Sequence, residues 1–590
     1  MRHADLSTPA DSLDRSASMP RPILLPGVAA ALVACLVGCA TSGTQSTPAV
    51  VFPSRTELAS IPSQPARVEA FGTSDVPVDT WTFDTPVPGD GAEHDAAGAW
   101  GQVARELQGA HATTTVLSAA LQCTARELAR FYADKRAMPT DSLRRFMAAR
   151  CGAATSGPSP LVWGLEGAAG MPDEAIAARA REAMAPALAS RLGHGHHLLG
   201  VDGFRDAKGA YVVAVTSEDV ARLEPGSLAV GADRRVVLRG ASRDELETIS
   251  ALINRGDAGT APCEADPRVK SPRFALTCEL APGDAFAWVE VLGRRKGQLL
   301  MRELLEALVH EGDGSGIEYA ARHVGAPAPV TSNASFTSAL VDRLNGVRAA
   351  AHLPTLALAP KQSAENARLA GTLIDASLTD DDGVADRAAI GLMAGWEVAG
   401  LIRSGNFFLA AVGPTSDATA WLDFALERPM GRSMLLDPAV RQIAVGPAIP
   451  PGGGALGAAV TTYAMFESDD HSADATALFR RIAAARAARG LPAPVRVQGL
   501  GEMDAELARV SKAGQSPMAA LEASMQVAVA RTGHGVRGWV YETSDLEHAE
   551  IPKELLAPGP LELMIGVTHH RAEGAAWGQL VVLAVLLGGQ

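Results

Sequence analysis

Six cysteines carry the most informative chemistry of this 590-residue chain. Cys35 lies inside an apolar run and Cys39 follows it, whereas the other four lie further along, at Cys123, Cys151, Cys263 and Cys278. An even number of cysteines in an oxidising compartment predicts disulfides, and four allow three pairings. We favour the two local ones, Cys123 with Cys151 and Cys263 with Cys278, because each pair lies within one apparent module. A zinc site would need CxxC spacing or histidines in step, and neither occurs.

The histidines form no recognisable metal or catalytic motif. His194, His196 and His197 read HGHH, which we interpret as an exposed glycine-rich turn, since no carboxylate or cysteine is placed to complete a coordination shell. His569 and His570 lie in the turn of the last hairpin that the pattern predicts, where we expect solvent. The acidic run at 380–383 lacks the alternating ligands of an EF-hand loop. HExxH and P-loop motifs are absent from the sequence, and we expect no catalytic residue, metal or cofactor.

The start of the chain has the pattern of a targeting signal. An apolar run at 23–36 is too short to span a bilayer and ends in Leu36-Val37-Gly38-Cys39. These residues resemble the lipobox of bacterial lipoproteins, which implies a signal peptide at 1–38, a lipid on Cys39 and, because Ala40 is not aspartate, an outer-membrane anchor. An ordinary secretory signal cleaved near Ala40 is the alternative, and the start stays open between Met1 and Met19. Residues 39–95, rich in Ser, Thr, Pro and Gly, predict a flexible tether.

Length and charge narrow the classes of function. At about 150 residues per domain, 590 residues suggest roughly four domains. The hydrophobic content of 47% and the charged content of 20% are those of globular proteins. The net charge of −14 leaves no basic surface for a phosphate backbone, so we expect no nucleic-acid partner.

Changes in the hydrophobic pattern mark two modules after the tether. Residues 96–220 show helical periodicity with a closing β signal and predict a mainly helical α/β module. Short alternating strands then predict a small β-sandwich at 221–312. Within 274–280 the apolar residues alternate with others, so that Cys278 points to the buried face.

The last 250 residues contain an internal repeat. Three landmarks of the first copy are Leu340, Arg348 and Pro354, and 138 positions later the chain has Leu478, Arg486 and Pro492. Near the other end, Leu435 and Gly446 recur 120 positions later as Leu555 and Gly566. Each copy begins with an amphipathic helix and ends in a β-hairpin, which predicts two related domains at 333–468 and 473–590. The end of the module at 96–220 shows a weaker similarity to the same repeat, in which Gly200 aligns with Gly446.

The first copy resembles the CAP (SCP-like) superfamily of cysteine-rich secretory proteins and antigen 5. The likeness rests on the segments 344–356, 391–400 (GLMAGWEVAG), 420–423 (AWLD) and 431–446 (GRSMLLDPAVRQIAVG). It implies an α+β fold class: CAP-like α-β-α sandwich units in tandem, preceded by the helical α/β module and the β-sandwich.

The departures from the family pattern decide the expected chemistry. Metal-binding members line a cleft with two histidines and two acids, but those histidine positions hold Leu369 and Gly431 here, and Leu507 and Ile551 in the repeat. These side chains offer no lone pair to a metal, so the resemblance implies no cation. The cleft candidates are Leu369, Glu397, Trp421, Gly431 and Arg432.

We therefore expect a surface-anchored bacterial lipoprotein whose degenerate CAP-like domains act as a binding module and not as an enzyme. By the resemblance, its partners are a lipid, a cell-wall glycan or an envelope protein, and it meets the membrane through its lipid anchor only. The alternative is a metal-dependent CAP protein or a hydrolase with a non-standard site that recruits His352, His534 or His548.

Overall fold

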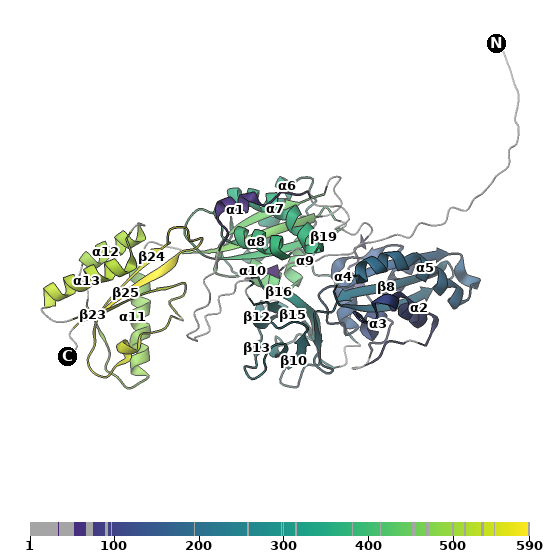
Figure 1. Ribbon diagram of the computed structural model, residues 1–590, viewed down its shortest axis with the longest axis horizontal. Coiled ribbons are helices and arrows are strands. Elements are labelled where there is room, and N and C mark those ends of the chain that lie inside the picture. Colours follow the sequence, from purple (N-terminus) through teal and green to yellow (C-terminus); the bar gives the residue numbers. More distant parts are fainter. Residues whose placement is uncertain are drawn as a thin grey trace, which may run out of the picture.

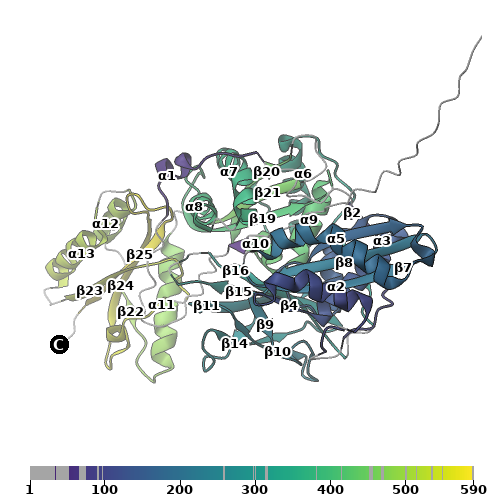
Figure 2. The same ribbon diagram turned by 45° about the vertical axis from the view of Figure 1, so that its right-hand side comes forward.

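The computed structural model describes most of the chain after residue 51. The described residues are 33–34, 52–65, 75–88, 92–95, 97–193, 195–256, 259–296, 298, 300–312, 316–379, 382–413, 415–450, 456–466, 471–497, 501–512, 515–532, 536–547 and 549–587. In Figures 1 and 2 an N-terminal unit (97–218) lies at one end of the molecule and a C-terminal unit (471–587) at the other. A central unit (333–466) and the strands of residues 221–310 lie between them.

The N-terminal unit places helices on both faces of a four-stranded sheet. Its elements are α2 (Ala99–Gln108), β4 (Thr115–Leu117), α3 (Ala119–Lys135), β5 (Met138–Pro139), α4 (Asp141–Arg150), β6 (Ser159–Glu166), α5 (Asp173–Leu192), β7 (His197–Arg205) and β8 (Gly209–Glu218). The sheet order is β4-β7-β8-β6, with β4 parallel to β7. A disulfide joins Cys123 on α3 to Cys151 after α4, which confirms this predicted bridge.

Two four-stranded sheets follow and share one core, which we call the sandwich. Their strands are β9 (Ala221–Leu223), β10 (Arg235–Ser242), β11 (Thr248–Asn254), β12 (Thr260–Pro262), β13 (Glu264–Ala265), β14 (Arg273–Glu279), β15 (Phe286–Arg294) and β16 (Arg302–His310). The sheet orders are β13-β14-β10-β9 and β12-β11-β15-β16. Cys278 faces the core, as the alternation predicts, and the predicted disulfide to Cys263 is confirmed.

The central unit also has helices on both faces of its sheet. Its elements are α6 (Asn333–Ala350), β18 (Ala357–Leu358), α7 (Pro360–Thr379), α8 (Asp382–Met393), β19 (Ile402–Val412), α9 (Ala418–Glu427), α10 (Pro429–Leu435), β20 (Val440–Ala448) and β21 (Leu456–Met465). The sheet order is β18-β20-β21-β19, and β1 (Val33–Ala34) pairs with β19 at the edge. Phe408 faces the core under α6 and α9, whereas its neighbour Phe407 faces α7 and α8.

The C-terminal unit contains α11 (His471–Ala487), β22 (Val495–Arg496), α12 (Gly501–Ser511), α13 (Pro517–Thr532), β23 (Val536–Thr543), β24 (Glu562–His570) and β25 (Gln579–Leu587). Its sheet order is β22-β24-β25-β23. Residues 580–587, the final apolar run, form most of a buried strand because both faces of β25 are covered by helices.

The N-terminal, central and C-terminal units thus share one sheet order. A short strand pairs in parallel with the first strand of a hairpin, and a fourth strand pairs antiparallel with the second strand of that hairpin. The hairpin is crossed closely by a helix at Gly200, Gly446 and Gly566, where an added Cβ would lie 2.1, 2.1 and 2.3 Å from the nearest heavy atom. At Gly200 and Gly446 the nearest atom belongs to the helix backbone, so only glycine allows this approach without displacing the helix, whereas at Gly566 it is the end of the Leu507 side chain.

Two buried arginines make matching contacts in the central and C-terminal units. Arg348 donates from Nε to the Pro354 carbonyl at 2.7 Å and from Nη1 to the Leu435 carbonyl at 2.7 Å. Arg486 donates from Nε to the Pro492 carbonyl at 2.8 Å and from Nη1 to the Leu555 carbonyl at 2.8 Å. These partners are the residues that the sequence repeat aligns. Each guanidinium satisfies carbonyl groups that would otherwise be buried without a donor.

The structure corrects the predicted flexible tether at 39–95 in two stretches. Residues 52–65 include α1 (Arg55–Ser60) and lie against the central unit, with Leu58 and Ile61 in a core beside α7 and α8 (Figure 1). Residues 75–88 contribute β2 (Asp75–Val76) and β3 (Thr80–Trp81), which pairs with β17 (Tyr319–Ala320). Composition misled the prediction, because a few apolar residues suffice to dock a short segment. The capping box of Ser54 and Glu57 is the local signal that could have shown the helix.

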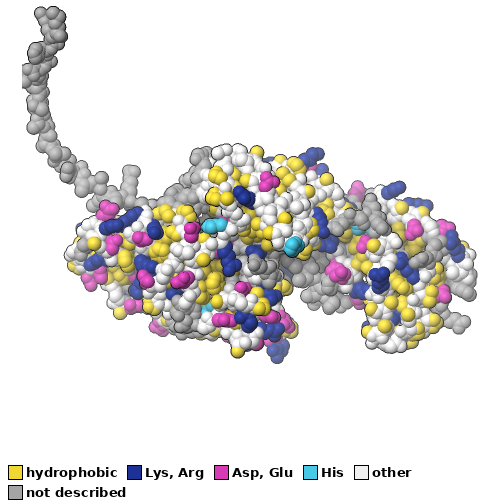
Figure 3. Space-filling model, turned by 180° about the vertical axis from the view of Figure 1, so that it is seen from behind, with side chains coloured by type: hydrophobic (Ala, Val, Ile, Leu, Met, Phe, Trp, Pro, Cys, Tyr) yellow, Lys and Arg dark blue, Asp and Glu magenta, His cyan; other side chains and the backbone are white. Residues whose placement is uncertain are grey.

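The surface mixes both signs of charge on the face that Figure 3 shows, where Lys and Arg side chains are interspersed with Asp and Glu. Among the residues that the structure describes, no helix combines the length and the apolar composition that crossing a membrane requires.

Candidate functional site

A cavity of about 760 Å³ lies where the N-terminal unit, the sandwich and the central unit meet. We call it the junction cavity. Its walls come from the start of α4, the start of β15, the chain at 318–325 and helix α9. Its apolar lining includes Val78, Phe286, Trp288 and Phe424. Because separate units supply the walls, the cavity exists only when they are docked, and its size is that of a small-molecule site.

Helix α9 holds one wall of the junction cavity in place. Its cap, Asp417, accepts hydrogen bonds through Oδ1 from the Thr419 amide at 2.8 Å and the Ala328 amide at 2.7 Å. Further along, Asp423 Oδ1 accepts from the Val324 amide at 2.8 Å. These bonds fasten the chain at 324–328 along the helix, because acceptors on one element satisfy backbone donors of the other.

An imidazole lies between two carboxylates at the cavity. His323 Nδ1 is 2.8 Å from Asp423 Oδ2, and His323 Nε2 is 3.7 Å from Asp79 Oδ1. The hydrogen bond to Asp423 raises the pKa of His323, and burial raises the pKa of Asp423. His323 therefore carries its positive charge to higher pH than a free histidine does.

Acidic groups dominate the charge of the lining. The cationic groups of the lining are the guanidinium groups of Arg322 and Arg432 and the imidazole of His323, and seven carboxyl groups accompany them, from Asp79, Asp141, Asp284, Glu318, Asp417, Asp423 and Glu427. This excess favours a neutral or cationic ligand that donates hydrogen bonds, and it disfavours an anion.

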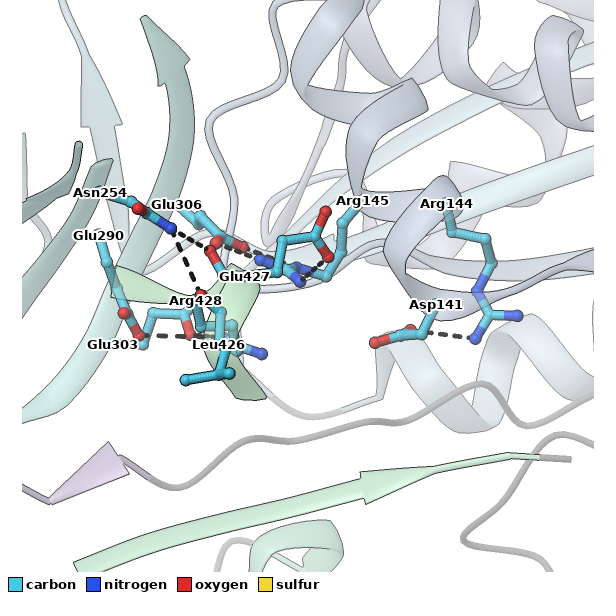
Figure 4. A network of polar contacts seen from close by, with 10 residues as sticks. All are labelled: Asp141, Arg144, Arg145, Asn254, Glu290, Glu303, Glu306, Leu426, Glu427 and Arg428. Carbon is cyan, nitrogen blue, oxygen red and sulfur yellow. Dashed lines mark hydrogen bonds and ion pairs between the residues drawn. The ribbon is translucent and has the colours of Figure 1, made fainter. Parts of the chain in front are cut away.

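Glu427 also belongs to a charge network that joins the three units (Figure 4). Arg145, on α4, donates from Nε to Glu306 Oε2 of the sandwich at 2.7 Å and from Nη2 to Glu306 Oε1. Its Nη1 is 3.6 Å from Glu427 Oε2 of the central unit. The guanidinium lies over the rings of Trp288 and Phe424, with centroids at 5.1 and 5.4 Å. With 5% of its side chain exposed, Arg145 is a buried link between the units.

The second half of the network centres on Arg428, whose side chain is 2% exposed. It pairs with Glu303, and its Nη2 is 3.9 Å from Glu290 Oε1. Glu290 Oε2 also accepts from the Met430 amide at 2.8 Å, and Asn254 Nδ2 donates to the Glu427 carbonyl at 3.0 Å. Burial raises the pKa of Glu290 and Glu427 and raises that of Glu303 well above its usual range. Arg145 and Arg428 face more glutamates than they can pair with one to one, so burial favours the neutral form of Glu290, Glu303 and Glu427.

The structure separates the cleft candidates that the sequence predicted. Leu369, on α7, packs into the core that α7 and α8 share with one face of the sheet, and Trp421 lies in the core on the opposite face, with Phe336 and Phe408. Glu397 is 3.4 Å from Arg55 at the seam with α1. Gly431 lies tightly against α9, and Arg432, which lines the junction cavity, donates to the Gly256 carbonyl at 2.7 Å.

His569 corrects the expectation of a solvated turn. It is the last residue but one of β24, it pairs with Leu580 and it is 9% exposed. The hairpin extends further than its apolar run suggested, because the alternation of Ile565 and Val567 continues inward to His569. Other predictions lie outside the described residues: those for Cys35, Cys39, His194, His534 and His548, and for Asp380 and Asp381 in the acidic run.

Of the residues at the junction cavity, the sequence indicated Arg432 but not the paired charges. His323 and Asp423 are 100 positions apart, and Arg145 and Glu306 are 161 apart. No local motif links either pair, so only the docked units reveal them.

Comparison with known proteins found no matching family model and no matching curated protein. Two similar solved structures are a cysteine-rich secretory protein from Staphylococcus aureus and an extracellular protein containing an SCP domain from Bacillus anthracis. The first is 11% identical, with a TM-score of 0.16, and the match covers 42% of this chain and 84% of that one. The second is 14% identical, with a TM-score of 0.16, and covers 42% and 88%. Values this low leave the function to be inferred from the residues of this chain.

Proposed function

We propose that this chain is a bacterial lipoprotein that binds a ligand of the cell envelope in the junction cavity. The cavity carries the proposal, because about 760 Å³ of space combines aromatic rings with converging polar groups. The central and C-terminal units are then two degenerate CAP-like domains. Their shared sheet order and the matching contacts of Arg348 and Arg486 support this duplication.

The charge of the lining favours a cell-wall glycan among the three ligand classes expected from sequence. Seven carboxyl groups against two guanidinium groups and one imidazole oppose an anionic lipid headgroup. Sugar hydroxyl groups donate to carboxylates, the apolar face of a sugar ring packs against Phe286 or Trp288, and an amino sugar adds a complementary charge.

Binding accounts for the polar groups better than hydrolysis does. His323 contacts Asp423 and Asp79, and the Thr419 hydroxyl donates to the Ala326 carbonyl at 3.0 Å. Among the described lining residues, no hydroxyl or thiol is bonded to His323, so these residues do not form a hydroxyl- or thiol-based catalytic triad.

Calorimetric titration with soluble, partly de-N-acetylated peptidoglycan strands tests the proposal. Ala320→Trp, at an exposed position in the lining, fills the cavity and should weaken binding at least about tenfold. Ala349→Trp, at an exposed position of α6 away from the cavity, is the matched control and should bind like the native chain. Equal affinity in both variants would refute the site. Binding to anionic vesicles that Ala320→Trp abolishes would replace the glycan with a lipid, and release of free sugars would show an enzyme.

The anchor has its own test. Mature protein from a bacterial host should carry acyl mass on Cys39, and Cys39→Ser should lack it. An unmodified mature chain beginning at Ala40 would instead support an ordinary secretory signal.

A further inference from the structure

Two imidazoles and a carboxylate meet in the C-terminal unit, far along the chain from the junction cavity. They belong to His471 and Asp474 in the first turn of α11 and to His569 near the end of β24. One ligand atom from each residue lies within 4.8 Å of the other two. Among the described residues this is the group with the arrangement of a metal site.

The local geometry suits a single small ion. His471 and Asp474 are three residues apart on one helix, so they share a face, and His471 Nδ1 is 3.6 Å from Asp474 Oδ2. Two ligands bound to one zinc ion at about 2.0 Å in tetrahedral geometry are about 3.3 Å apart. The His471 and His569 rings are edge to face, with centroids 4.1 Å apart. Small side-chain rotations would therefore bring all three donors onto one ion.

The surroundings are those of a built site with an access route. His471 Nδ1 is buried and has no hydrogen-bond partner among the described residues. Phe466 covers the His569 ring with a centroid distance of 4.4 Å. The side chain of Asp474 is 40% exposed and leaves a path from solvent. A buried imidazole nitrogen without a hydrogen-bond donor is a lone pair available to a cation.

This cluster is distinct from the cleft positions discussed above. Leu507, which occupies one of those positions in the repeat, lies on α12 and packs against the other side of the sheet. The repeat aligns the three cluster residues with Asn333, Phe336 and Ile449 in the central unit, where Phe336 packs against Trp421. The donor set therefore belongs to the C-terminal unit alone.

We propose that His471, Asp474 and His569 bind one zinc ion. Two imidazole nitrogens and one carboxylate oxygen are a common zinc donor set, and three protein ligands leave a fourth position for water or a ligand from outside. The ion fastens the first turn of α11 to the end of β24, beside Phe466 at the end of the central unit. The zinc concentration would then control how firmly the start of α11 is attached to β24 and to Phe466.

The test uses the full chain without a histidine tag. His194, His196 and His197 are replaced by glutamine to remove adventitious binding, and metal is stripped before titration with zinc chloride. One equivalent should bind, and cobalt(II) should give the intense visible absorption of a tetrahedral site. His471→Ala, Asp474→Asn and His569→Ala should each weaken zinc binding at least about 100-fold. Zinc should raise the thermal midpoint of the parent chain and not that of the variants.

The matched control is His570→Ala, one residue further along β24, whose ring Nδ1 is 3.2 Å from the Val510 carbonyl. It should keep the full zinc affinity and the cobalt spectrum. Asp474→Asn preserves side-chain size, so its loss of binding would not reflect misfolding, which circular dichroism checks. The absence of a stoichiometric ion in the parent chain would overturn the proposal, as would retained binding in the cluster variants or an equal loss in His570→Ala.

Discussion

Replacing Arg145 by methionine should undock the N-terminal unit from the sandwich and the central unit. The substitution removes both hydrogen bonds to Glu306 and the 3.6 Å contact with Glu427, while leaving both carboxylates in place. Removing one partner of a buried ion pair costs about 3–5 kcal/mol, because the remaining charge is neither solvated nor paired. The side chains of Arg145 and Glu306 are each 5% exposed, so this range applies without a discount for solvent screening.

The partner substitution separates loss of charge from loss of packing. In the double variant Arg145→Met, Glu306→Leu, the carboxylate of Glu306 is no longer left unpaired, and most of the free energy should return. A coupling of about 2 kcal/mol or more is expected between the two sites. Recovery stays incomplete because Glu427 still lacks its cation.

Hydrogen exchange detected by mass spectrometry measures the loss of stability separately in each unit. This is needed because a chain of several units does not have to unfold in one step. Amides of α4 and β16 should lose about 3 kcal/mol of protection in the single variant, whereas those of β24 and β25 should not change. A loss below about 1 kcal/mol, or a double variant no better than the single one, would refute the role assigned to this ion pair.

Four further predictions concern other contacts. Burial raises the pKa of Glu303 above its ordinary value of 4.5, so above pH 4.5 the folded chain holds a proton that the unfolded chain releases. The free energy of unfolding should therefore fall as pH rises from 4.5 through the folded pKa, by up to about 1.4 kcal/mol per pH unit. Denaturation measured across pH should show this slope, and Glu303→Gln should flatten it. Reducing the disulfide between Cys263 and Cys278, 15 residues apart, should cost the sandwich about 3 kcal/mol in urea titrations, and an unchanged midpoint would contradict this. Arg348→Met and Arg486→Met should each destabilise only their own unit by about 3 kcal/mol, as proteolysis of each unit would show, because each leaves buried carbonyl groups without a donor. Leu58→Ala should release α1 from the central unit, with about 3 kcal/mol less protection of residues 52–65; equal protection in both chains would show that the segment is held by other contacts.

The sequence by itself determined the features that depend on neighbouring residues. The alternation around Cys278 placed it on a buried face, and the spacing of cysteines within modules indicated both disulfides. Periodicity predicted that each copy begins with a helix, which is α6 or α11, and ends in a hairpin, which is β20–β21 or β24–β25, because this pattern reports which face of an element is buried.

Tertiary structure alone decided where the units meet. The contacts of His323 with Asp423 and of Arg145 with Glu306 cross unit boundaries, and the cluster of His471 and His569 joins two ends of one unit. A pairing of distant side chains leaves no period in the sequence, because it depends on how folded surfaces dock. The segment at 52–65 shows the same limit. Its composition resembles a linker, yet the surface of the central unit buries Leu58 and Ile61 and so gives the segment a fixed position.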